Sequence, residues 1–172
     1  MNAGAKLATV CVVGTMLIAG CGQGPSTGNT TTKSESIPQE FKSSLLQFLE
    51  LAGELNASTE AGVTRRDFSA GYAKVKSKSE ILFAQWPAAF QPQAKDEIEK
   101  AMHGYELAIE LWGEDSFVWE SSDLGKRLAE YGVVLEKPLT GYLAANHVGK
   151  IFGVAGGHYT VAKTSILGTL SR

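Results

Sequence analysis

Cysteine is scarce in this chain of 172 residues, and its two cysteines, Cys11 and Cys21, both lie within the first 21 residues. Everything after Cys21 must therefore fold without an internal disulfide. An exported domain without disulfides depends on its apolar core for stability, and a hydrophobic content of 44% is consistent with such a core. The remaining length suffices for one domain.

An excess of positive charge is also lacking. The chain has 16 Lys and Arg residues against 18 Asp and Glu residues, and cationic side chains alternate with anionic ones along the sequence. A protein that binds nucleic acid without sequence preference needs clustered cations to displace counterions. The sequence therefore predicts that nucleic acid is not a partner.

Motifs for metal binding and catalysis are missing as well. Of the three histidines, His147 and His158 share nearly the same face of a helix, but they are about 16 Å apart along its axis, too far to share one metal ion. The motifs of serine hydrolases and zinc proteases are absent, and we interpret the acidic residues between 114 and 123 as a solvated connection. We therefore predict no metal, no cofactor and no enzymatic activity.

A short apolar run stands at the N-terminus. It follows the single cation Lys6, extends from Leu7 to Ile18, and ends in small residues. About 12 residues are too few to span a bilayer as a helix, which takes roughly 20. A cation, a short apolar stretch and a small-residue site are together typical of a signal peptide, so we expect residues 1–20 to be removed.

The end of this run, Ile18-Ala19-Gly20-Cys21, resembles the lipobox of bacterial lipoproteins. The resemblance covers only the first 21 residues. It implies that the Cys21 thiol receives a diacylglyceryl group, that cleavage follows Gly20, and that the new amino terminus is acylated, usually with a fatty acid such as palmitate. Several acyl chains anchor a protein stably, because each buried methylene contributes about 0.8 kcal/mol. The implied location is the bacterial cell envelope, facing the periplasm or the exterior, with the choice of inner or outer membrane open.

Residues 21–37 have few apolar side chains and are rich in Gly, Ser, Thr, Asn and Gln. Such a composition cannot bury enough surface to offset the entropy of ordering, so we predict a flexible linker after the lipidated cysteine. The folded domain is then expected over residues 38–172.

Helical periodicity begins directly after the linker. Pro38 is suited to the first turn of a helix that ends between 56 and 62, and Thr64 with Asp67 predicts the capped start of a second helix. The third helix is predicted from about Pro92 to Trp112. The expected core seams, each with four- and three-residue spacing, are Phe41, Leu45, Phe48, Ala52 and Leu55, widened by Leu46 and Leu49; then Phe68, Tyr72, Val75, Ser79, Leu82 and Trp86; then Ala94, Ile98, Ala101, Tyr105, Ala108 and Trp112.

Two further helices complete the expected fold. One is short, from Asp123 to Tyr131, with a serine cap before it and Gly132 as its stop. The last runs from about Leu139 to Leu170, and the pair Gly156-Gly157 leaves open whether it is continuous. Short polar connections between amphipathic helices favour antiparallel packing, so the fold class is all-α: an up-and-down helical bundle of four to five helices.

Small residues recur every four positions along this last helix, most closely at Gly149, Gly153 and Gly157. Each glycine costs about 1 kcal/mol relative to alanine in a helix, so a ridge of them requires a compensating gain. The spacing resembles a glycine zipper, which lets two helices approach closely. We expect a tight helix crossing inside the bundle, with a self-association or membrane-contact face as the alternative.

Two functions follow from this organisation. The first is a lipid-anchored structural or protein-interaction module, whose partner is another envelope protein or a second copy. The alternative is a bundle that binds a small apolar ligand or haem. The residues that either line such a ligand site or simply pack the core are Trp86, Tyr105, Trp112 and His158.

Overall fold

The computed structural model describes residues 37–114, 118–135, 137 and 141–171. Over these residues it contains five helices and no strand: α1 (Gln39–Ala61), α2 (Arg65–Ala84), α3 (Pro92–Gly113), α4 (Asp123–Glu130) and α5 (Gly141–Leu170). The predicted all-α bundle is confirmed. The predicted signal peptide, Cys21 and nearly all of the linker lie outside the described residues. Within the described part, no helix combines the length and apolarity that a membrane crossing requires.

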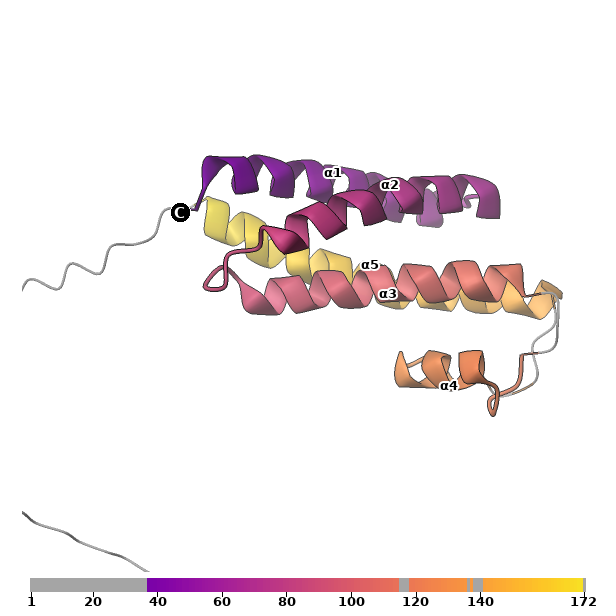
Figure 1. Cartoon of the computed structure of the whole chain (residues 1–172). Coiled ribbons are helices and arrows are strands. Elements are labelled where there is room, and N and C mark those ends of the chain that lie inside the picture. The colour runs from indigo at the N-terminus through magenta and orange to yellow at the C-terminus, as the bar shows by residue number, and fades with distance from the viewer. Residues whose placement is uncertain (1–36, 115–117, 136, 138–140, 172) are drawn as a thin grey trace, which may run out of the picture. The chain divides into compact units, whose positions relative to one another are not determined.

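Two helix pairs make up the body of the bundle (Figure 1). Helix α3 packs along α5 and α1 packs along α2, while contacts of α1 with α5 and of α2 with α3 join the two pairs. The short α4 lies against α3. The start of α1 and the end of α5 lie at the same end of the bundle, so these two helices are antiparallel.

The predicted helix boundaries are set by local capping groups. The Thr64 hydroxyl accepts a hydrogen bond from the main-chain NH of Asp67 at 3.2 Å, and it donates to the Asp67 carboxylate at 2.7 Å. The Ser122 hydroxyl caps α4 by accepting a hydrogen bond from the main-chain NH of Gly125 at 3.0 Å. Helix α1 is followed by Gly62 with φ 84°, and Gly132 after α4 has φ 87°, a region that glycine enters without a steric penalty. Pro38 stands just before α1 as its cap residue rather than inside the first turn.

The expected seams are largely the buried core. Leu46 is the exception, because 42% of its surface is exposed and it does not widen the seam of α1. Trp86 and Trp112 end their seams only partly buried against the core. Ser79, the one polar seam member, is buried, and its hydroxyl donates to the main-chain oxygen of Lys76 at 2.8 Å. A local bond of this kind satisfies the serine without a partner from another helix.

Helix α5 is continuous over 30 residues, so Gly156-Gly157 does not break it. Its buried side faces the other helices through seven residues with the same spacing as the other seams: Val148, Ile151, Phe152, Ala155, Tyr159, Ala162 and Ile166. This seam supplies the contacts with α3 and α1 and leaves the opposite side of the helix outside the core.

Candidate functional site

The close crossing of α1 and α5 uses two glycines that the four-residue ridge does not contain. A Cβ atom on Gly156 would lie 2.5 Å from Oδ1 of Asn56, and one on Gly53 would lie 2.9 Å from the Tyr159 hydroxyl. At either distance a methyl group would force the neighbouring side chain to shift, so glycine at both positions allows this approach without rearrangement. The Tyr159 hydroxyl donates to the main-chain oxygen of Leu49 at 2.6 Å, which ties α5 to α1 at the same level.

The expectation of a tight internal crossing at Gly149, Gly153 and Gly157 is therefore wrong. All three are exposed, and a Cβ atom added to any of them would meet nothing within 4 Å. The glycine that does contact α1 is Gly156, one residue and about 100° of rotation away from Gly157. The sequence spacing identifies a ridge of small residues on α5, but it does not indicate which side of α5 is covered by α1.

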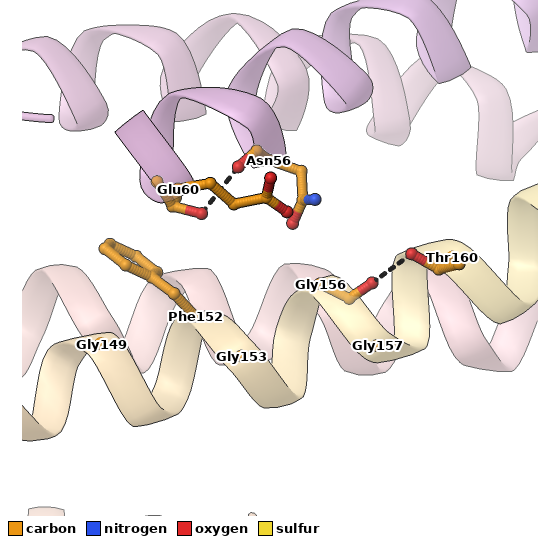
Figure 2. Close-up of a pocket in the computed structure, with 9 residues that line it drawn as sticks. Asn56, Glu60, Gly149, Phe152, Gly153, Gly156, Gly157 and Thr160 are labelled. Atoms are coloured by element: carbon orange, nitrogen blue, oxygen red, sulfur yellow. Dashed lines mark hydrogen bonds between the residues drawn. The ribbon is translucent and has the colours of Figure 1, made fainter. Parts of the chain in front are cut away.

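These three glycines instead border an open groove between the end of α1 and the middle of α5 (Figure 2). Its volume is about 500 Å³. Helix α1 provides one wall, where Asn56 and Glu60 are labelled, and the backbone of α5 provides the floor. The lining residues are Asn56, Thr59, Glu60, Gly149, Phe152, Gly153, Gly156, Gly157 and Thr160.

Most hydrogen-bonding groups of the groove are already satisfied within their own helix. The Thr59 hydroxyl donates to the main-chain oxygen of Asn56 at 2.7 Å, and the Thr160 hydroxyl donates to that of Gly156 at 2.8 Å. Oδ1 of Asn56 accepts from the Tyr105 hydroxyl at 3.1 Å. The groove therefore offers mainly the Phe152 ring, methyl groups and glycine backbone, with Glu60 as its charged member. A surface of this kind is suited to close van der Waals contact with another backbone.

The groove continues into a second seam along α5. Its members are exposed and follow a spacing of 4, 4, 3, 4 and 3 residues: Gly149, Gly153, Gly157, Thr160, Thr164 and Leu167. We call these six residues the outer seam. A surface helix of a bundle needs one seam to face the core, but α5 has two, and the residues that the structure describes cover the inner one alone. The four-and-three spacing is that of helices packed at a shallow angle.

The candidate ligand-lining aromatics belong to two separate clusters. The Trp86 ring lies 5.4 Å from that of Phe41, edge to face, and its indole NH donates to a main-chain oxygen at 2.6 Å. Trp112 lies 5.8 Å from Phe152, and Tyr105 lies 5.7 Å from Phe68 in the same second cluster. Burial raises the pKa of Tyr105 well above its usual value. These ring contacts support the interpretation of all three as packing residues.

His158 does not line the groove; it lies on the side of α5 that faces α3 and Tyr131, the residue after α4. Its Nδ1 is 2.6 Å from Oε2 of Glu97, and its ring lies 6.1 Å from the ring of Tyr131. Lys100 donates to the other Glu97 oxygen at 2.6 Å. The Lys100 ammonium, and then the His158 ring, lower the pKa of Glu97. The bond from His158 to Glu97 joins residues 61 positions apart, and no motif in the sequence indicates it.

Tyr131 completes this polar cluster. Its ring covers Gly104 of α3, where any side chain would collide with it, and lies 5.8 Å from the ring of His103. Among the described residues, the Tyr131 hydroxyl is the one buried side-chain polar atom without a hydrogen-bond partner. Burial, and then the charge of Glu97, raise its pKa.

The described residues bring together no group of three His, Cys, Asp or Glu side chains that could hold a metal ion. Of the acidic residues between 114 and 123, Asp123 pairs with Arg127 at 3.1 Å, and Asp115 lies outside the described residues. Comparisons with protein-family models, with curated proteins and with solved structures each found no match.

Proposed function

We propose that this chain is a lipid-anchored protein of the bacterial cell envelope whose helical bundle is a protein-interaction module, and that it binds its partner through the outer seam of α5. Acylation of Cys21 holds the module at a membrane, and residues 21–37 space the bundle from the lipid headgroups. The bundle contributes a rigid surface for a partner helix and no chemistry.

The proposed anchor is supported by the sequence Ile18-Ala19-Gly20-Cys21 at the end of a short apolar run. Further support comes from composition, since the segment that follows is polar and rich in small residues. Two or three acyl chains suffice for stable attachment, so no membrane-spanning helix is required of the bundle.

One observation carries the proposed interaction: α5 has a second seam with helix-packing spacing, and that seam is open. Its three glycines each cost about 1 kcal/mol of helix stability relative to alanine. Among the described residues nothing compensates for this cost, because none of their atoms lies within 4 Å of the missing Cβ positions. Close approach of a helix from outside would compensate for it.

Incorporation of radiolabelled palmitate tests the anchor. The parent chain is expected to be labelled and Cys21→Ser to be unlabelled and released from the membrane fraction. Equal labelling of the two proteins would contradict the anchor.

The interaction is tested with Gly153→Leu, which fills the outer seam without touching the core. The full chain, extracted from membranes with a mild detergent, is expected to migrate as a complex, and Gly153→Leu as a single chain. Ala70→Leu is the matched control, because Ala70 is an exposed small residue on α2, away from the seam. A parent protein that migrates as a single chain, or a complex that survives Gly153→Leu, would overturn the proposal.

A further inference from the structure

We infer that the occupant of the α1–α5 groove and the outer seam is a second copy of this chain, with the two α5 helices side by side and parallel. This inference rests on the proposed function, of which it names the partner. Four observations support it. They are the groove of about 500 Å³, the open outer seam, the opposite charges of α1 and α5, and the end of the bundle at which α1 begins.

A helix that packs closely on the glycine floor of this groove must itself present small residues, because large side chains on either helix keep the two backbones apart. Helix α5 is such a partner. The outer seam extends from Gly149 to Leu167, about 27 Å at 1.5 Å per residue. In a parallel pair the glycines of one copy face the glycines of the other, and the threonines face the threonines. Like surfaces that complement themselves produce closed two-fold pairs.

The charges of α1 and α5 are opposite. Helix α1 carries four glutamates and one lysine, whereas α5 carries two lysines and no acidic residue. Glu60 lines the groove on the α1 side. Lys150 lies on the other side of the outer seam, about 100° around α5 from Gly149. Neither Glu60 nor Lys150 takes part in an ion pair among the described residues.

These positions distinguish the two ways of pairing. A two-fold axis along α5 places α1 of each copy against the Lys150 side of the other α5, whereas an axis across α5 places the two α1 helices, with their glutamates, against each other. The positions of Glu60 and Lys150 along the bundle axis agree with the first, parallel arrangement. Measured from the contact of Asn56 with Gly156, Glu60 is about 6 Å along the bundle and Lys150 about 9 Å in the same direction.

The start of the described chain agrees with the parallel arrangement. Helix α1 begins at the end of the bundle where α5 ends, so a parallel pair brings the starts of both α1 helices to the same end (Figure 1). Anchorage of both copies through Cys21 in one membrane is compatible with this arrangement. A single helix pair is a small interface beside stable soluble dimers, which bury about 1,200 Å² or more, but anchoring in one membrane raises the effective concentration of the second copy.

The test is photo-cross-linking of the full chain in its membrane, with photoreactive benzoylphenylalanine in place of Val161. This valine is 57% exposed, and it lies eleven residues after Lys150, hence on nearly the same side of α5. The control position is Ile81 of α2, also apolar and 52% exposed. We expect an adduct of two chains at Val161, at least fivefold above the control, joined to residues 47–54 of the second copy's α1.

The other outcomes separate the inference from the proposed function. An adduct joined to α5 of the second copy would overturn the parallel arrangement. An adduct with a different protein would overturn self-pairing and leave the interaction module standing. No adduct above the Ile81 level would overturn both. The same probe in place of Lys150 is a second cross-linking position, and we expect it to reach the region of Glu60 in the second copy. Circular dichroism of each variant measures its helix content and shows that it is folded.

Discussion

Alanine at two neighbouring glycines of α5 should have opposite effects on stability. At Gly153 a Cβ atom meets nothing within 4 Å, so Gly153→Ala changes only the intrinsic helix preference. We expect this substitution to raise the free energy of unfolding by about 1 kcal/mol.

At Gly156 the same gain is outweighed. The new methyl group would lie 2.5 Å from Oδ1 of Asn56, which accepts the hydrogen bond of the Tyr105 hydroxyl. Moving Asn56 leaves a buried hydroxyl without its partner, which costs about 1–3 kcal/mol, and the crowding itself costs about 1–3 kcal/mol. We therefore expect Gly156→Ala to lower the free energy of unfolding by about 1–5 kcal/mol, the sum of the two costs less the helix gain of about 1 kcal/mol.

Urea unfolding of the full chain, followed by circular dichroism at low protein concentration, measures both effects. Gly168→Ala is a second control, because this exposed glycine of α5 also has open space around its missing Cβ atom. It should resemble Gly153→Ala. Equal effects at Gly153 and Gly156, or a stabilising Gly156→Ala, would refute the assignment of Gly156 to the helix crossing.

Three further predictions concern polar groups. Tyr159→Phe should lower the free energy of unfolding by about 1 kcal/mol in the same urea assay, because it removes a buried hydrogen bond; an unchanged midpoint would contradict that bond. Tyr131→Phe should raise it by about 1 kcal/mol, since the hydroxyl is buried without a partner among the described residues; a destabilised variant would show that the hydroxyl does find one. The pKa of Glu97 is lowered in the folded state by Lys100 and then by His158, so its contribution to stability is present above its unfolded pKa and is lost as the pH falls through the folded pKa. Glu97→Gln should therefore flatten the loss of stability between pH 6 and 3, and an unchanged pH dependence would argue against the contact.

Much of the fold follows from the sequence, because a helix seam is a property of one segment. The regular seam of α3 and the cap at Thr64 depend on residues three and four positions apart, and both are confirmed. The stop at Gly132 is likewise local, since its φ of 87° favours glycine.

The candidate site depends on how helices are rotated against each other, and periodicity does not contain that rotation. The ridge of glycines is visible in the sequence, but only the placement of α1 shows that Gly156 is covered and Gly153 is open. Leu46 shows the same limit, because it lies beside the buried Leu45 and yet is exposed. The contact of Glu97 with His158 crosses between helices and has no local pattern at all.

A charge exchange between Lys150 and Glu60 tests the parallel pairing of two chains most directly. In the proposed arrangement, Lys150→Glu sets two carboxylates against each other, and Glu60→Lys sets two ammonium groups against each other. An exposed ion pair of this kind contributes about 0.2–1 kcal/mol. Each single variant replaces this attraction with a repulsion between like charges, so it should weaken pairing in the membrane several-fold. The double variant should restore the yield of two-chain adduct from the Val161 probe to at least half that of the parent. Single variants that pair like the parent, or a double variant no better than the weaker single, would contradict the pairing.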